Sequence, residues 1–448
     1  MLGARLLPVL ALYWLLVPTA HAIDAAGQAA IDSDWPQWRG PLGTGVAPHA
    51  DPPLLWDANG TNIRWKTPIP GRGHSTPIVW GDRVFLTTAV PFGQPLEPRP
   101  STAPGNHDNL LVTHRHRFQA FAVSRASGKI LWQQTLREAL PKEQGHQTGS
   151  LASGSPVTDG EHLFVLFGSF GLYCLDLDGQ LVWQVDFGPL QSLHGHGEGS
   201  SPALYGNTLI VNWDHEGQSF VVALDKRTGR QLWKVERTEV TSWATPIVVE
   251  HGGQPQVIVS GTSRIRSYDL ATGKVLWECG GLSANVVASP VAADGMVVAG
   301  SSYDKRALLA IRLDGATGDI TGTDQVAWNR LRGTPYVPSP LLYDGMLYFL
   351  THYQGILSRV DVRTGEDRPD AFRVEGIGNV YSSPVAAAGR VYVTDLDGTT
   401  AVLAHSPMPR ILAVNRLHDP ISASPALSGR ELFLRGEKFL YCLAEEKK

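Results

Sequence analysis

The sequence has few cysteines, almost no excess charge and only one long apolar run. The 448 residues include three cysteines, Cys174, Cys279 and Cys442, which lie far apart and are odd in number. A framework of disulfides is therefore not what stabilises the fold. The formal net charge is −4, and no cluster of lysine and arginine is long enough to neutralise a run of phosphates. We expect no nucleic-acid partner.

The one long apolar run lies at the amino terminus. It extends over the 12 residues from Leu6 to Val17 and is followed by a small-x-small pattern that ends at Ala22. A membrane-spanning helix needs ~20 apolar residues, whereas a signal peptide needs fewer. We therefore predict a signal peptide over residues 1–22, cleaved after Ala22, and a secreted or periplasmic chain without a membrane span. Because no cysteine precedes Cys174, we expect no lipid anchor near the amino terminus.

Glycine and proline are abundant, at 47 and 31 residues, which is typical of many short strands joined by tight turns. A small residue, a proline, an apolar stretch, a turn and a β-branched stretch recur eight times along the chain. The marker prolines are Pro77, Pro156, Pro202, Pro246, Pro290, Pro340, Pro384 and Pro425. After the first interval they are 41 to 50 residues apart, close to the period of a four-stranded propeller blade. The first interval is 79 residues long, and we interpret its excess as loop insertions within residues 90–117 and 137–153.

A second signature lies between successive prolines, as in ALDKRTGRQLW (residues 223–233) and SYDLATGKVLW (residues 267–277). The aspartate accepts hydrogen bonds from turn amides, the glycine supplies a positive φ, and the tryptophan packs against the neighbouring blade. The last repeat stops at Lys448 without an outer strand, while residues 62–69 resemble an outer strand that no inner strands precede. The two ends are therefore expected to complete one blade.

These patterns predict an all-β protein. We expect residues 62–448 to form an eight-bladed β-propeller of four-stranded antiparallel blades, closed by pairing of the N-terminal and C-terminal strands. Residues 23–61 would form a leader segment before the ring. We expect a monomer.

The second signature resembles the Trp-docking motif Ala-x-Asp-x-x-Thr-Gly-Lys-x-x-Trp of the pyrroloquinoline-quinone-like (quinoprotein-type) repeat family. DWPQWRGPLGTGV (residues 34–46), HGEGSSPAL from His196, NWDHEG from Asn212 and TSWATP from Thr241 resemble secreted bacterial members of that family. The resemblance covers essentially the whole mature chain and implies the propeller fold. The family includes quinoprotein alcohol and glucose dehydrogenases, and also non-catalytic members such as the outer-membrane assembly lipoprotein BamB, so the resemblance alone does not decide the activity.

Candidate functional residues lie in the loops that join one blade to the next and in the loops between the second and third strands. Both kinds of loop emerge on one face of a propeller, at the mouth of its channel. The candidates for ligand binding are His194, His196, Glu198, Asp214, His215, Glu216, Trp243, Tyr336 and Tyr381. The same loops carry further histidines and tyrosines, namely His74, His107, His114, His116, His146, Tyr303, His352 and Tyr353.

Two chemical interpretations of these residues stay open. His194, His196, Glu198 and His215 would hold a divalent metal or act as acid and base, or they would simply stabilise Gly-rich turns by bonding to loop backbone. Trp243 would form the floor under a planar ligand or plug the channel.

Three functions follow from these interpretations. The first is a non-catalytic binding or scaffold protein with a protein, peptide or glycan partner in the cell envelope, and the repeat favours it directly. The second is a dehydrogenase that uses pyrroloquinoline quinone (PQQ) with calcium. The family's enzymes hold the quinone between a tryptophan and a disulfide of adjacent cysteines, and this sequence has neither adjacent cysteines nor a haem-attachment motif. The third is a metal-dependent enzyme that uses the His194, His196, Glu198 and His215 set.

Overall fold

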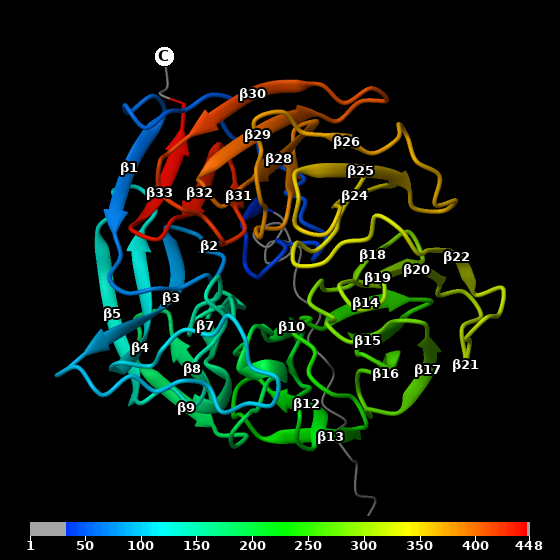
Figure 1. The fold of residues 1–448 in the computed structure, drawn as a ribbon, viewed down its shortest axis with the longest axis horizontal. Helices are drawn as coiled ribbons and strands as arrows, with labels where there is room; N and C mark the ends of the chain where they lie inside the picture. The colour runs from blue at the N-terminus through cyan, green and yellow to red at the C-terminus, as the bar shows by residue number, and fades with distance from the viewer. Residues whose placement is uncertain (1–32, 446–448) are drawn as a thin grey trace, which may run out of the picture.

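The computed structural model describes residues 33–445, which form a ring of eight sheets around a central axis (Figure 1). The predicted signal peptide, residues 1–22, and residues 23–32 of the predicted leader lie outside the described residues. Each sheet is one blade, whose first strand lies nearest the axis and whose last lies at the rim. The predicted all-β, eight-bladed propeller is confirmed. Among the described residues, no helix is long and apolar enough to cross a membrane.

The first four blades begin after Pro77, Pro156, Pro202 and Pro246. Blade 1 contains β2 (Ile78–Trp80), β3 (Arg83–Phe92), β4 (Arg115–Ser124) and β5 (Ile130–Ala139). Blade 2 contains β6 (Val157–Thr158), β7 (His162–Leu166), β8 (Leu172–Asp176) and β9 (Leu181–Val185), with the 3-10 turn η1 (Gly168–Phe170) between β7 and β8. Blade 3 contains β10 (Ala203–Tyr205), β11 (Thr208–Trp213), β12 (Ser219–Asp225) and β13 (Gln231–Arg237), and the 3-10 turn η2 (Leu193–Gly195) precedes it. Blade 4 contains β14 (Ile247–His251), β15 (Gln254–Ser260), β16 (Arg264–Asp269), β17 (Val275–Gly280) and, added at the rim, β21 (Gly318–Asp319).

The other four blades complete the ring. Blade 5 contains β18 (Val291–Ala293), β19 (Met296–Ser301), β20 (Ala307–Arg312) and β22 (Val326–Arg330). Blade 6 contains β23 (Leu341–Tyr343), β24 (Met346–Leu350), β25 (Ile356–Asp361) and β26 (Phe372–Arg373). Blade 7 contains β27 (Val385–Ala387), β28 (Arg390–Thr394), β29 (Thr399–Ala404) and β30 (Ile411–Arg416). Blade 8 contains β31 (Ala426–Ser428), β32 (Glu431–Arg435), β33 (Phe439–Ala444) and β1 (Ile63–Pro68).

Blade 8 closes the ring with strands from both ends of the chain. β1 pairs antiparallel with β33, with Trp65 opposite Cys442, and Figure 1 shows the blue β1 beside the red β33. This pairing confirms the predicted closure. It gives the outer edge of β33 a partner and so removes a free strand edge.

In five blades a tryptophan of the outer strand connects the blade to the next one. The Trp183 indole Nε1 donates to the Lys226 carbonyl at 3.0 Å, and a Cβ added to Gly229 would lie 2.7 Å from the Trp183 ring. Trp65, Trp132, Trp233 and Trp328 make the same pair of contacts with the following blade. The glycine is therefore required twice, for its positive φ and for the close approach of the indole.

Blade 4 departs from the predicted four strands. Its tryptophan, Trp277, donates to Gln256 of its own blade at 3.0 Å instead of to the next blade. The segment between β20 and β22 brings β21 alongside β17, where Gly318 pairs in parallel with Trp277. The connection between β20 and β22 of blade 5 therefore joins blade 4 through a backbone ladder.

The first insertion is also more regular than predicted, because β3 and β4 continue into the stretch we expected to be loop. Their ladder extends to the pair of Phe92 with Arg115. The remaining loop, residues 93–114, starts from the end of this extended hairpin.

A chain of hydrogen bonds around the axis explains, at seven of the eight positions, why the residue before a marker proline is serine or threonine. In seven of the eight junctions, the backbone N–H of this residue donates to the hydroxyl of its counterpart in the next blade, at 2.8 to 3.0 Å. The members, in order, are Thr76, Ser155, Ser201, Thr245, Ser289, Ser339, Ser383 and Ser424. All eight residues are buried, so each bond satisfies an amide that water does not reach.

The described part of the leader segment belongs to the core of the ring. Trp35 is completely buried and exchanges two backbone hydrogen bonds with Val79 of β2. The Arg39 guanidinium donates to the carbonyls of Pro384 and Pro340 at 2.8 and 2.7 Å, and so connects blades 6 and 7. Figure 1 accordingly shows the dark-blue start of the described chain near the centre of the ring.

Candidate binding face

Three loops on one face of the ring bring four histidines together. His107 lies in the β3–β4 loop, His146 in the β5–β6 loop, and His194 and His196 in the β9–β10 loop. The ring centroid of His107 lies 4.7 Å from that of His194 and 4.8 Å from that of His196. His196 lies 5.3 Å from His194 and 4.7 Å from His146. We call these four residues the histidine cluster.

Each ring of the histidine cluster uses one nitrogen to contact a loop oxygen. The distances are 3.0 Å from His107 Nδ1 to the Gly105 carbonyl, 3.3 Å from His194 Nδ1 to the Pro104 carbonyl, and 3.1 Å from His196 Nε2 to the His107 carbonyl. His146 Nδ1 lies 2.7 Å from the Thr148 hydroxyl. These contacts orient the four rings.

Burial keeps part of the cluster uncharged. Burial and, to a smaller extent, the charges of nearby histidines lower the pKa of His196 to about 4. Burial also lowers the pKa of His146. The rings of His146 and His196 are therefore neutral at pH 7, and each keeps a lone pair on one nitrogen.

Glu198 does not face the histidine cluster, although it is only two residues from His196. Its carboxylate accepts hydrogen bonds from the Ser169 N–H at 2.9 Å and from the Ser169 hydroxyl at 2.5 Å. Burial raises the pKa of Glu198 to about 7. The side chain thus binds η1 of blade 2 and anchors the β9–β10 loop to the ring.

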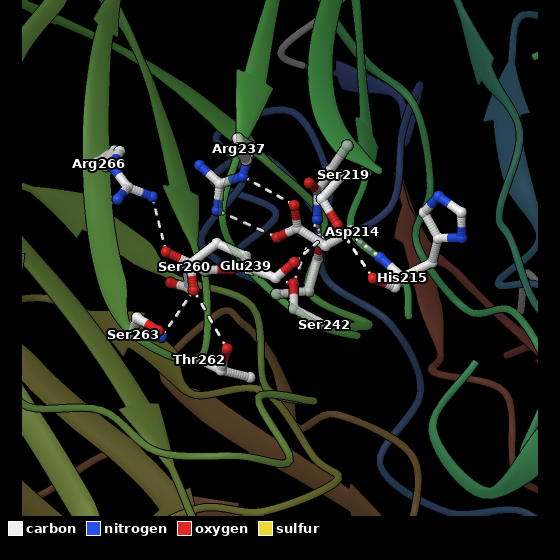
Figure 2. Close-up of polar contacts among 12 residues, drawn as sticks. Asp214, His215, Ser219, Arg237, Glu239, Ser242, Ser260, Thr262, Ser263 and Arg266 are labelled. Carbon is white, nitrogen blue, oxygen red and sulfur yellow. Dashed lines mark hydrogen bonds and ion pairs between the residues drawn. The ribbon is translucent and has the colours of Figure 1, made fainter. Parts of the chain in front are cut away.

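Asp214 belongs to a buried charge network between blades 3 and 4 (Figure 2). Arg237 donates to both of its carboxylate oxygens, at 2.7 and 3.0 Å, and neither side chain is exposed. Beside this pair, Glu239 accepts from Arg266 at 2.6 Å and from the Thr262 hydroxyl at 3.1 Å. Asp214 and Arg237 therefore form a structural ion pair, and neither carboxylate oxygen of Asp214 is directed to solvent.

His215 belongs neither to the histidine cluster nor to the charge network around Asp214. Figure 2 shows its ring turned away from the Asp214 and Arg237 pair. Its Nδ1 accepts from the Gln191 N–H at 3.3 Å, and its Nε2 lies 3.2 Å from the Gln218 carbonyl. The ring is 8% exposed and stabilises the β11–β12 turn by bonding to its backbone.

Glu216 and Trp243 also hold the loops in place. The Glu216 carboxylate accepts from the Thr241 N–H at 3.1 Å and from its hydroxyl at 2.7 Å. The Trp243 indole donates to the Gly197 carbonyl at 2.7 Å and packs against Gly199. Trp243 lines a pocket between blades 2 and 3 together with Glu198 and the buried Trp213.

The other two candidates, Tyr336 and Tyr381, belong to a group of aromatic rings over blades 5 to 7. The Tyr336 ring is stacked on His352 with centroids 4.7 Å apart, and His352 lies 4.4 Å from Tyr353. Tyr353 is stacked on Tyr381 at 5.6 Å, and Tyr303 on Tyr336 at 5.7 Å. These five residues form the aromatic cluster. Tyr303 is 63% exposed, so one end of the cluster reaches the surface.

Thr148 lies between the two clusters. Its hydroxyl lies 2.7 Å from His146 Nδ1, and Thr148 is near enough to Tyr381 to influence its pKa, which burial raises. The β5–β6 loop and the loop before blade 7 are therefore neighbours, and the two clusters adjoin. Sequence reasoning placed these residues in the correct loops but did not show that they touch, because the loops are far apart in the chain.

Only one group of three donors is closely spaced in residues 33–445. Asp159, Glu161 and His162 each bring a donor atom within 4.8 Å of the other two. Asp159 is already paired with Lys226 at 2.8 Å and accepts the amides of Glu161 and His162, as a turn aspartate does. The predicted set is divided: His194 and His196 share a cluster, whereas Glu198 and His215 are bonded elsewhere.

Comparison with known proteins identifies the family. The family model described as outer membrane protein assembly factor BamB matches residues 93–216 and again 217–446. The chain belongs to this family. A BamB of Francisella salina is 30% identical over 99 residues, which are 22% of this chain and 17% of that protein. The match thus spans about a sixth of the length of that relative.

Solved structures share the fold. BamB from Moraxella catarrhalis is 16% identical and superposes with a TM-score of 0.53 over 80% of this chain and 99% of its own. Quinohemoprotein alcohol dehydrogenase from Comamonas testosteroni is 10% identical, with a TM-score of 0.60 over 95% of this chain and 84% of its own. An outer membrane protein assembly factor and an alcohol dehydrogenase therefore share this architecture, so the function has to be argued from the site.

The residues of this chain do not fit PQQ and calcium. Cys174, Cys279 and Cys442 are unpaired and buried in three different blades, so no disulfide can lie against a quinone. The carboxylate of Asp214, a candidate base or calcium ligand on this face, is paired with Arg237.

Proposed function

We propose that this chain is a non-catalytic binding propeller of the cell envelope, which holds a segment of a protein partner on the face formed by the two clusters. The signal peptide predicted over residues 1–22 and membership of the BamB family support the envelope. The observation that carries the proposal is the aromatic cluster, which continues from the exposed Tyr303 to the partly buried Tyr381.

Stacked aromatic rings suit the binding of a peptide better than a chemical reaction. Tyrosine offers a large, rigid apolar surface and a hydroxyl, and few rotamers are lost when a partner covers it. Tyr303, Tyr336 and His352 lie with interplanar angles of 15 to 25 degrees, which leaves their shared edge as a flat strip. Apolar and aromatic side chains of an extended segment would pack against such a strip.

The polar candidates support the same proposal. Glu198, Asp214, His215 and Glu216 each use their polar atoms to hold a loop or a blade. A general acid or base has to reach a substrate proton, and these groups already have structural partners. They make the face rigid, as a binding surface on a scaffold should be.

Site-specific photo-crosslinking in cells tests the proposal. A photoreactive residue in place of Tyr303 should trap a protein partner, because this side chain is 63% exposed at the end of the strip. Met408 is the matched control, since it is 74% exposed but lies in the turn between the third and fourth strands of blade 7. We expect crosslinks from position 303 and none of the same mass from position 408.

The trapped partner then allows a quantitative measurement. Tyr303→Ala and Tyr336→Ala should weaken its affinity at least tenfold each, which corresponds to ~1.4 kcal/mol, whereas Met408→Ala should leave it unchanged. Equal crosslinking at the two positions, or unchanged affinity in the tyrosine variants, would show that the aromatic cluster is not the binding surface.

A further inference from the structure

The histidine cluster lies on the proposed binding face, but the proposed function gives no role to the chemistry of its imidazoles. Its members come from three loops, two of them separated by about 90 residues, as between His107 and His196. Imidazole nitrogens are the ligands that Zn²⁺ and related transition metals accept most readily in proteins. The question is whether the arrangement of the rings suits a metal.

The spacing of the rings matches that of metal-bound imidazoles. With a metal–nitrogen distance of ~2.0 Å and an open angle between ligands, two bound rings have centroids roughly 5 Å apart. The three centroid distances among His107, His194 and His196 are 4.7, 4.8 and 5.3 Å. The backbone therefore already places three rings at the required separation.

The hydrogen bonds of the rings match as well. A metal-bound histidine usually donates its second ring nitrogen to a carbonyl or carboxylate, which fixes its orientation. His107 and His194 use Nδ1 in this way, on the carbonyls of Gly105 and Pro104, and His196 uses Nε2. Nε2 of His107 and His194 and Nδ1 of His196 remain for a metal.

The backbone at the cluster is held in a conformation that side chains rarely adopt. His194 has a φ of 59° and lies in the left-handed region. The Asn109 amide stabilises this conformation by donating to the carbonyls of His194 and Gly195, at 3.1 and 2.8 Å. The β3–β4 loop thus supplies one ring of the cluster and also holds a second one in place.

We propose that His107, His194 and His196 bind one transition-metal ion of the Zn²⁺ class, which fastens the β3–β4 loop to the β9–β10 loop. The three free nitrogens do not all lie within 4.8 Å of one another, so the rings must turn on binding, and their contacts with the loop carbonyls must adjust as they turn. Rotation about the Cβ–Cγ bond of histidine has broad minima and leaves the backbone in place.

This assignment changes the metal site predicted from the sequence. His194 and His196 stay in it, His107 enters, and Glu198 and His215 leave because Ser169 and the loop backbone already occupy them. The role of the metal is to hold a loop on the binding face, and no chemical step is required of it. The inference is therefore independent of the identity of any partner.

Titration of the tag-free, chelator-treated full chain with ZnCl₂ tests the proposal. We expect one ion per chain, and His107→Ala, His194→Ala and His196→Ala should each weaken binding at least tenfold. His114→Ala is the matched control, since this histidine lies in the same loop and its ring contacts the hydroxyl of its neighbour Thr113. It should bind Zn²⁺ as the unaltered chain does.

A second measurement separates the site from non-specific binding. Zn²⁺ should protect residues 93–114 from limited proteolysis in the unaltered chain and in His114→Ala, but not in His107→Ala. No Zn²⁺ binding, or an equal loss of binding in His114→Ala, would overturn the proposal. Binding without protection would equally overturn it, because the metal would then not fasten the loop.

Discussion

Thr76 and Thr245 occupy equivalent positions before marker prolines, yet replacing each by valine should have different consequences. The Thr245 hydroxyl accepts the Ser201 N–H at 3.0 Å, and both residues are buried. Valine keeps the shape but leaves this amide without an acceptor, which costs about 1–3 kcal/mol. The Thr76 hydroxyl is buried and has no partner among the described residues, so Thr76→Val should be neutral or stabilising.

The difference between the two variants is measurable. Unfolding entropy of about 2.1 cal/mol/K per residue makes a loss of 1–3 kcal/mol equivalent to a fall in Tm of roughly 1–3 °C for a chain of this size. We expect that fall, together with a lower urea midpoint, for Thr245→Val and no fall for Thr76→Val. Equal Tm values for the two variants would refute the reasoning, since the substitutions are chemically identical and differ only in the hydrogen bond.

Three further predictions concern the docking glycine Gly229, the buried carboxyl group of Glu198 and the binding of PQQ. Gly229→Ala should lower Tm more than Gly206→Ala, because both have a positive φ but only the former would place a Cβ 2.7 Å from the Trp183 ring. The folded protein keeps a proton on Glu198 between its ordinary pKa of 4.5 and about 7, so stability should fall as pH rises through that window. A urea series at several pH values should show a flatter profile for Glu198→Gln, and an unchanged profile would contradict the assignment. Adding PQQ and Ca²⁺ to the purified protein should leave the near-ultraviolet spectrum of the free quinone unchanged, and a new bound-quinone band would contradict the fit described above.

The fold was predictable because its determinants are local and repeated. A Ser-Pro or Thr-Pro pair every 41 to 50 residues after the first interval and the Thr-Gly turn before a tryptophan are visible without knowing any contact. The contacts that require these recurring residues could be inferred from the sequence only in part. The hydroxyl of Ser289 accepts an amide 44 residues earlier, and Trp183 docks on a glycine of the next blade. The repeat period implies contacts between neighbouring blades, but it does not show which atoms form them.

The site was less predictable because its contacts are long-range and compete with one another. Glu198 and His196 are only two residues apart in the sequence. The Glu198 carboxylate nevertheless accepts a hydrogen bond from Ser169, whereas the His196 ring packs against His107. Nothing in the spacing of the sequence decides between these partners. The aromatic cluster was hidden for the same reason, since its rings come from separate loops that meet only when the blades close the ring.

The sequence by itself determined the number of blades, their order and the pairing of the two chain ends, because each depends on a repeated local pattern and on hydrophobic burial between neighbouring sheets. Only the tertiary structure decided which polar groups support the scaffold and which remain available. Asp214 illustrates the difference, since its carboxylate could have been a ligand until the fold placed Arg237 against it. A buried charge takes the partner that compensates its loss of water, and that partner is set by three-dimensional proximity.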